Sequence, residues 1–145
     1  MKVEGIEIEE LYELLEMLKN RGIEIVYPKP MLVELLAKLF REAEKKSLKR
    51  LPEYVWSKLR ALLVSGEIVL EDLAVEDVEV VEKLRLSGFR DLFDCIAYAI
   101  AKRLKGILLT MDRTFKNFIS AIGEDVSIVK DHNELRELVE RYKPE

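Results

Sequence analysis

The chain has 145 residues, of which 49% are apolar and 36% charged, and its formal net charge is −4. This balance is typical of one folded domain of ordinary size, and it excludes a disordered chain and a protein that coats nucleic acid through overall positive charge. The single cysteine, Cys95, excludes an internal disulfide and a cysteine metal cage.

The remaining composition bears on where the protein works. No apolar run reaches the length of a membrane-spanning helix, and the N-terminus lacks a basic stretch followed by an apolar one. We therefore expect a cytoplasmic protein. Glutamine is absent, while Glu, Lys, Ile and Leu dominate, a bias that resembles proteins from hot environments.

Apolar side chains recur every three or four residues in seven segments, which predicts amphipathic helices. In chain order these helices are 8–21, 31–46, 52–66, 75–86, 91–105, 112–122 and 132–143. Short runs rich in branched side chains lie between them and predict strands. The strands are 23–27, 67–70, 107–110 and 126–129. This alternation predicts an α/β domain with a parallel sheet covered by helices on both faces.

Three expectations concern how these segments begin and end. Gly22 is placed to end the first helix in a left-handed conformation. Gly106 is expected to reverse the chain between the fifth helix and the strand after it. Asp131 is expected to cap the last helix, with Glu134 as its reciprocal partner.

Acidic residues gather in the stretch 90–112. Asp91 and Asp94 are three residues apart in the first turn of a helix, and Asp112 directly follows an apolar strand. Each could be a helix cap or a first-turn acid. Asp94, however, lies between Phe93 and Cys95, and carboxyl ends of strands are where α/β sites form.

Chain reversal brings the helix start and the strand end together. Carboxylates that converge in this way raise each other's pKa unless a divalent cation separates them. Oxygen ligands without cysteine or a usable histidine favour Mg²⁺ or Mn²⁺ over zinc. Glu34, near the start of a helix that follows a strand, is a further candidate; alternatively, it forms an i, i+4 ion pair with Lys38.

At these residues the chain resembles the PIN-domain family of metal-dependent nucleases, which includes the VapC-type toxins. The matching pieces are YPKPMLVELL and DLFDCIAYAIAKRLKGILLTMDRTF. Glu34 stands at the family's helix acid, Asp94 and Asp112 at its two later acids, and Asp91 at an acid of some members. Thr110 and Phe115 fit a T-x-D-x-x-F ending.

The resemblance implies a three-layer α/β fold, an acidic Mg²⁺ or Mn²⁺ site and hydrolysis of RNA by a metal-bound water. Residues 1–145 would form one such domain. PIN domains normally open with a strand that ends in Asp-Thr-Asn or Asp-Thr-Ser, whereas this chain opens with MKVEGIEI. We therefore expect the first strand and its Asp to be missing, which makes the domain incomplete at its N-terminus. Residues 3–8 could serve as a makeshift strand with Glu4 or Glu7 inward, or a second copy could supply a strand by swapping.

The leading functional hypothesis is an endoribonuclease framework with Glu34, Asp94 and Asp112 as catalytic residues and Asp91 as an additional metal ligand. Basic side chains would hold the RNA backbone, or they are solvated helix faces. They are Lys38, Arg41, Lys45, Arg113 and Lys116. Two alternatives remain open. One is a non-catalytic PIN-like module that acts by dimerisation or by binding a protein such as an antitoxin; the other is a phospho-acceptor α/β switch.

Overall fold

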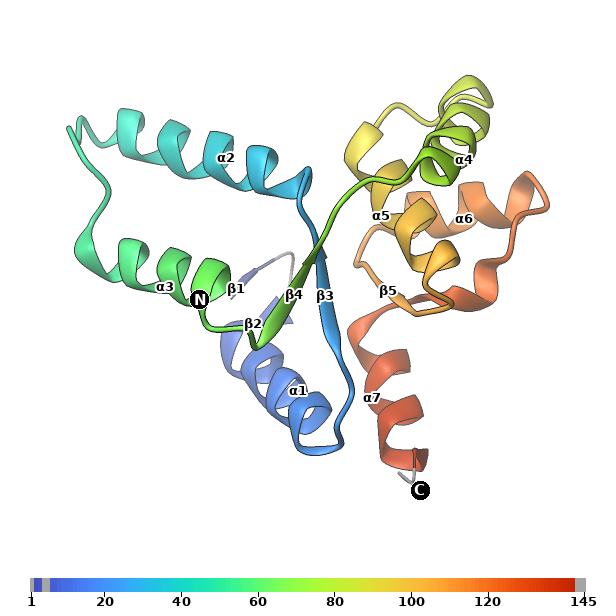
Figure 1. Cartoon of the computed structure of the whole chain (residues 1–145), viewed down its shortest axis with the longest axis horizontal. Helices are drawn as coiled ribbons and strands as arrows, with labels where there is room; N and C mark the ends of the chain where they lie inside the picture. Colours follow the sequence, from blue (N-terminus) through green and yellow to red (C-terminus); the bar gives the residue numbers. More distant parts are fainter. Residues whose placement is uncertain (1, 4–5, 143–145) are drawn as a thin grey trace.

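The computed structural model describes residues 2–3 and 6–142, and it confirms the predicted α/β class (Figure 1). The helices are α1 (Ile8–Asn20), α2 (Met31–Lys45), α3 (Glu53–Val64), α4 (Val75–Leu86), α5 (Leu92–Arg103), α6 (Arg113–Ala121) and α7 (His132–Arg141). The strands are β1 (Lys2–Val3), β2 (Ile6–Glu7), β3 (Ile25–Pro28), β4 (Ile68–Glu71), β5 (Leu108–Leu109) and β6 (Val129–Lys130). A 3-10 turn, η1, spans Val126–Ile128.

The predicted parallel pairing is present in two separate pieces. Ile25 of β3 lies opposite Ile68 of β4, and Leu108 of β5 lies opposite Val129 of β6, both in parallel register. Among residues 2–3 and 6–142, no strand pairs with both pieces, so each is a two-stranded sheet. Helix packing, rather than a continuous ladder of hydrogen bonds, therefore joins them.

Helices cover both faces of the β5 strand. Leu108 packs on a cluster from α4, α5 and α6 whose buried members include Leu84, Tyr98 and Phe115. Leu109, the next residue, packs on a second cluster formed by α1 and α7. Successive strand residues point to opposite faces, so the strand lies between two helical layers. This arrangement is the predicted three-layer order.

The second cluster also joins the two sheet pieces. Its buried residues are Leu14, Leu18, Leu135 and Val139. Ile25 of β3 packs against it, as does Leu109 of β5. Ile25 and Leu109 therefore pack against the same cluster, which links β3 to β5.

The N-terminal expectation is only partly covered. Residues 2–3 and 6–7 form an antiparallel pair, with Lys2 opposite Glu7, instead of one strand over 3–8. Glu4 and the side chain of Glu7 lie outside the described residues. The missing first strand and the swapped strand both stay predictions.

The predicted strand over 126–129 is wrong in its first three residues. They form η1, because Asp125 accepts a hydrogen bond from the Ser127 backbone N–H at 2.9 Å. Such a local side-chain bond competes with strand pairing. Only Val129 and Lys130 join the sheet.

The chain reversal after α5 differs from its prediction in one residue. Lys105, with φ of 55°, adopts the left-handed conformation, whereas Gly106 does not. Leu104 is the last half-helical residue, so the next position is the one that needs positive φ. An added Cβ on Gly106 would meet only the Ala101 carbonyl oxygen, at 4.0 Å.

We expect Lys105→Gly to raise the free energy of unfolding by about 0.5–1 kcal/mol, because glycine removes the left-handed strain at the expense of some chain entropy. Urea unfolding measures the change. Gly106→Ala is the matched control and should be close to neutral. A larger gain from the control than from Lys105→Gly would contradict this account.

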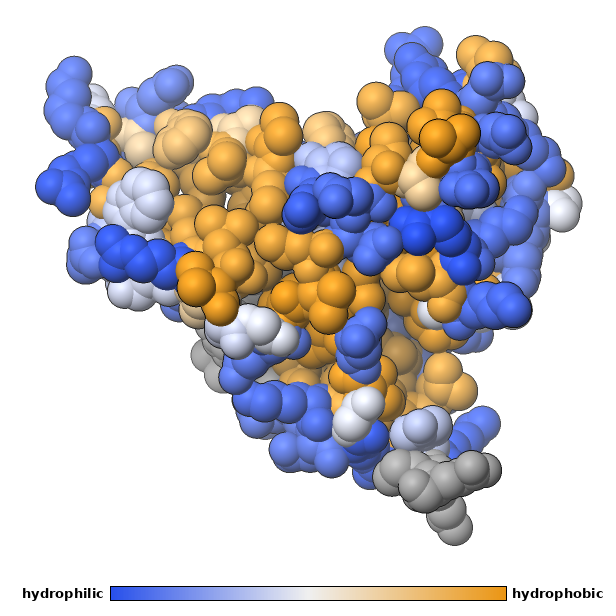
Figure 2. All heavy atoms as spheres, viewed as in Figure 1, coloured by the Kyte–Doolittle hydropathy of each residue, from blue (hydrophilic) through white to orange (hydrophobic). Residues whose placement is uncertain are grey.

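Helices α2 and α3 extend together to one side of the molecule, where they form an arm (Figure 1). No residue of α2 is buried, and Leu59 is the buried residue of α3. Apolar atoms spread across this arm and the centre of the same face (Figure 2). Within the described range, no helix is both long enough and apolar enough to cross a membrane. The arm therefore presents an apolar face that no other described element covers completely.

Candidate acidic centre

Asp91 caps helix α5. Its Oδ1 accepts hydrogen bonds from the backbone N–H groups of Phe93 (3.0 Å) and Asp94 (3.3 Å). The capping interpretation is thus confirmed for Asp91. These bonds fix the carboxylate at the helix start and leave Oδ2 outside them.

Asp112 caps helix α6 in the same way. Its Oδ1 accepts from the Phe115 N–H at 3.2 Å, while its own N–H donates to Thr110 Oγ1 at 3.1 Å. Phe115 is fully buried, with its ring edge-on to Phe89 and Tyr98 at centroid distances of 4.9 and 5.9 Å. The three residues of the T-x-D-x-x-F ending therefore form one turn, anchored in the core, that orients the Asp112 carboxylate.

Asp94 is the third residue of α5 and is partly buried. Its pKa is raised from 3.8 to about 7 by burial first, and then by repulsion from Asp91 and Asp112, a hydrogen bond to the Asp112 side chain, and repulsion from Glu34. Three of the predicted acids therefore raise the pKa of the fourth, Asp94. The Asp94 and Asp112 side chains lie within hydrogen-bonding reach of each other, and the charges that raise the Asp94 pKa are all acidic.

Glu34 approaches this centre from α2, just after β3. Its Oε1 accepts from Lys38 Nζ at 3.2 Å, so the predicted i, i+4 pair is present. The Glu34 side chain is 27% exposed, and its charge also helps raise the pKa of Tyr27, which burial raises most. Glu34 thus forms its predicted pair with Lys38, and its charge also raises the pKa of Asp94.

The carboxylate oxygens suit a hard divalent cation, but the described side chains are too far apart to hold one ion together. Within the described part of the chain, no three Asp, Glu, His or Cys side chains come close enough to hold one metal ion together. Charge repulsion acts over several ångströms, whereas coordination needs every oxygen within about 2.0–2.6 Å of one point. Asp94 and Asp112 are the two central acids of the candidate site, and the charges of Asp91 and Glu34 also reach Asp94.

Cys95, next to Asp94, is fully buried and free. Burial, followed by the charges of Asp94 and Asp91, raises the pKa of its thiol to about 11. A thiol that stays protonated is neither a nucleophile nor a metal ligand. Cys95 instead packs in the core formed by α4, α5 and α6.

A hollow that the sequence did not reveal has Asp112 in its wall. We call it the α6–α7 pocket; it has a volume of about 550 Å³. Its walls are the starts of α6 and α7: Thr110, Met111, Asp112, Arg113, Lys116, Asn117, Asp131, His132, Asn133 and Glu134. Two adjacent parallel strands, each followed at once by a capped helix, place the two helix starts side by side. That pattern was the available signal.

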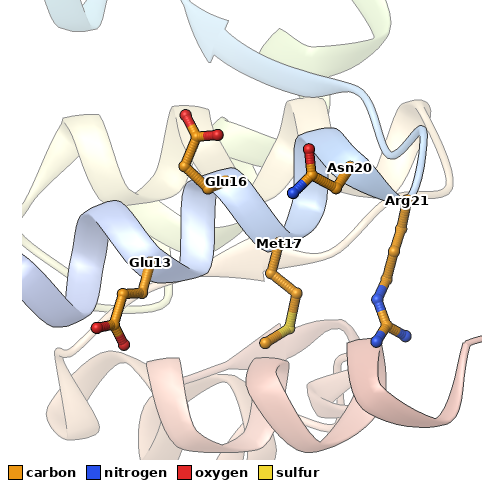
Figure 3. A pocket seen from close by; sticks show the side chains of 5 residues that line it. All are labelled: Glu13, Glu16, Met17, Asn20 and Arg21. Carbon is orange, nitrogen blue, oxygen red and sulfur yellow. The ribbon is translucent and has the colours of Figure 1, made fainter.

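A second hollow of about 530 Å³ lies beside α1 (Figure 3). None of its lining residues belongs to the acidic centre. Glu13 and Glu16 point apart in it. Arg21 reaches α7, where its Nη1 donates to the carbonyl oxygens of Val139 and Tyr142. A cation at the C-terminal end of a helix stabilises that end, so Arg21 links the end of α1 to the end of α7.

Comparison with known proteins gives one match. The model of a family described as PIN domain matches residues 3–119. No curated protein and no solved structure matches the chain. The matched range includes all four acids of the centre, whereas α7, with its half of the α6–α7 pocket, lies beyond it.

Proposed function

The chain belongs to the PIN-domain family, and from this premise we propose that it is a framework for metal-dependent endonucleolytic hydrolysis of RNA. The family indicates a nuclease-type fold. The observation that carries the proposal is the crowding of acids around Asp94, whose pKa is raised by the nearby Asp91, Asp112 and Glu34 as well as by burial. The charges that raise the Asp94 pKa are all acidic, and such a carboxylate group is suited to a divalent ion.

PIN domains generally depend on divalent metals, and the acids suited to hold Mg²⁺ or Mn²⁺ here are Asp94, Asp112, Glu34 and Asp91. When bound, such an ion polarises the scissile phosphate and lowers the pKa of the attacking water. The chain itself contributes fixed geometry. Cap bonds hold one oxygen of Asp91 and one of Asp112, which leaves the other oxygen of each available.

The helix ends favour the substrate as well. The N-termini of α5 and α6 both lie at the acidic centre, because Asp91 and Asp112 cap them. Their backbone dipoles favour negative charge and offset part of the repulsion between the acids and a phosphate.

Basic side chains supply a path for the RNA backbone. Lys38 pairs with Glu34, Lys45 with Glu42 and Lys116 with Glu134. Arg41 and Arg113 are exposed and have no ion pair among the described residues, so both are free to contact RNA, and we assign the first phosphate contact to Arg41. On the face that bears Glu34, Arg41 lies about 10 Å and Lys45 about 16 Å further along α2.

The direct test is cleavage of RNA with Mn²⁺ by the natural chain, by Asp94→Asn and by Asp112→Asn. Activity that is unchanged in both variants would refute the assignment. Activity lost in both, with the fold intact by circular dichroism, would support it.

A specific observation also favours the alternative, a PIN-like module that acts by binding a second copy or an antitoxin-like protein. PIN domains often pair with antitoxins. The arm formed by α2 and α3 exposes 47% of Phe40, 39% of Trp56 and 52% of Leu63. Exposed apolar side chains that gather on one face in this way mark interaction surfaces. Of the two occupants we favour a second copy, because two identical arms would cover each other's apolar faces.

We expect Phe40→Asp to convert a dimer into a monomer in sedimentation velocity, because a charge would be buried in the interface without a partner. Val64→Asp is the matched control. Val64 is 79% exposed and lies away from the helix face that carries Leu59. A natural chain that sediments as a monomer, or a control that dissociates as readily as Phe40→Asp, would contradict the dimer.

A further inference from the structure

Amide and imidazole side chains are rare in this chain, and most of them lie in one place. The 145 residues include three asparagines, one histidine and no glutamine. Asn117, His132 and Asn133 all line the α6–α7 pocket. The third asparagine, Asn20, lines the separate hollow beside α1. Such a concentration of neutral hydrogen-bonding groups beside the acidic centre points to a ligand with polar, uncharged edges.

Three charged residues of the pocket, Lys116, Asp131 and Glu134, are bonded to one another. Lys116 Nζ donates to both Glu134 carboxylate oxygens at 2.8 Å. Glu134 also accepts from the Asp131 N–H at 3.1 Å, and Asp131 accepts from the Glu134 N–H at 2.8 Å. This network confirms the predicted capping box. It also holds the wall rigid and neutralises the lysine.

The remaining polar side chains have capacity to spare. Those of Arg113, Asn117 and Asn133 make no hydrogen bond to any residue that the structure describes. The His132 ring lies against Met111, with Nδ1 3.2 Å from Sδ, and its Nε2 is 3.7 Å from Glu10 Oε2. Each amide offers two donor hydrogens and a carbonyl acceptor, and an imidazole beside a thioether forms a surface on which a ring can stack.

We propose that the α6–α7 pocket binds a nucleobase of the RNA, next to the phosphate that is cut, with a purine favoured. This inference rests on the proposed ribonuclease function. Asparagine pairs with adenine, and arginine with guanine, through two hydrogen bonds each. Proteins read unstacked RNA bases by such edge contacts combined with stacking.

Three features favour a base over a phosphate as the occupant. Asp112, Asp131 and Glu134 are all in the wall and repel an anion. Lys116 is paired with Glu134, which leaves Arg113 as the one lining cation without an ion pair among the described residues, against three carboxylates. The volume of about 550 Å³ falls in the usual range for a small organic ligand.

Asp112 belongs to both the acidic centre and the pocket wall. A base held in the pocket therefore lies on the nucleotide adjacent to the metal-binding acids. The pocket would set the sequence preference of cleavage, while the acids perform the reaction. This division places the specificity on α7, beyond the part of the chain that matches the family model.

The test uses side-chain amide NMR signals of the full chain in EDTA, titrated with AMP to millimolar concentration. Because the chain has three asparagines and no glutamine, each amide pair can be followed separately. We expect AMP to shift the signals of Asn117 and Asn133 and to leave Asn20 unchanged. Asn133→Ala should weaken AMP binding about tenfold, with Asn20→Ala as the matched control. Asn133→Asp, which keeps the side-chain shape, gives the same readout if the alanine variant does not fold.

Two results would overturn the inference. One is the absence of any shift at Asn117 and Asn133; the other is ribose phosphate binding as tightly as AMP, which would show an anion site. The experiment contains no metal, so AMP binding by a chain that does not cleave RNA would refute the proposed function alone. Cleavage of RNA by a chain that does not bind AMP would refute the pocket alone.

Discussion

Replacing Asp94 with asparagine will lower Mn²⁺-dependent RNA cleavage about 10²-fold or more and will also stabilise the metal-free protein. Cleavage falls because the variant removes one carboxylate oxygen charge from the contact with Asp112. Stability rises because the same carboxylate is partly buried and surrounded by acids. A residue retained for packing alone would not show these opposite effects.

The pH dependence of stability has a definite sign. The pKa of Asp94 is about 7 in the folded protein, above its ordinary value of 3.8. A raised carboxyl pKa means that the folded state keeps its proton while the unfolded chain ionises, so stability falls as pH rises between these two values and stays low above them. Because the side chain is partly exposed, we expect Asp94→Asn to recover on the order of 1–2 kcal/mol above that range.

Urea unfolding in EDTA, at a series of pH values, measures this recovery. Asp72→Asn is the control, because its carboxylate is 78% exposed and its one ion pair among the described residues is with exposed Lys29. The natural chain and the control should lose stability over the same pH range, and Asp94→Asn should lose less. An Asp94→Asn variant that is less stable than the natural chain at high pH would contradict the crowded acidic centre.

Arg103→Ala will lower the free energy of unfolding by about 3–5 kcal/mol, the largest loss that we expect from a single side chain outside the apolar core. Asp77 is 1% exposed, and Arg103 Nε donates to both of its oxygens at 3.0 and 3.1 Å. The same guanidinium donates to the Asp72 carbonyl at 3.2 Å and pairs with Glu71 at 3.1 Å. Its loss would leave the buried Asp77 carboxylate without a cation. It would also remove the bonds that hold the end of α5 to α4 and β4.

Two variants check the cause of this loss. Lys102→Ala, at the neighbouring exposed position, removes a lysine whose partner Glu124 also pairs with Lys83, and it should cost less than about 1 kcal/mol. Asp77→Asn combined with Arg103→Leu should recover part of the stability. The asparagine oxygen can still accept from the Ala74 N–H, which Asp77 now does at 2.8 Å, and needs no cation. Equal losses from Arg103→Ala and Lys102→Ala would refute the role of the buried pair.

Local patterns in the sequence were sufficient for the helices and for the α/β class, because apolar periodicity, capping acids and glycine ends act over a few residues. Gly22, with φ of 71°, and the Asp131–Glu134 box behave as predicted. The errors arise where a local bond or position outweighs a general preference. Asp125 and Ser127 replace a strand with a turn, and Lys105, rather than Gly106, takes the left-handed conformation where the chain reverses.

The proximity of some site residues could likewise be predicted from the sequence, and that of others could not. Asp94 and Asp112 could be paired in advance, because a helix and the strand that follows it are short and antiparallel. Asn117 and Asn133 could not, because their meeting depends on β5 and β6 pairing in register, with Leu108 opposite Val129. Whether the sheet is continuous was equally out of reach, since it depends on strand neighbours far apart in the chain.

Calorimetric titration of the metal-free chain with Mn²⁺ tests the acidic centre most directly. We predict that the natural chain binds Mn²⁺, that Asp94→Asn and Asp112→Asn each weaken binding by about tenfold or more, and that Asp72→Asn does not. Absence of Mn²⁺ binding by the natural chain, or equal binding by all four proteins, would contradict the account and favour the non-catalytic module.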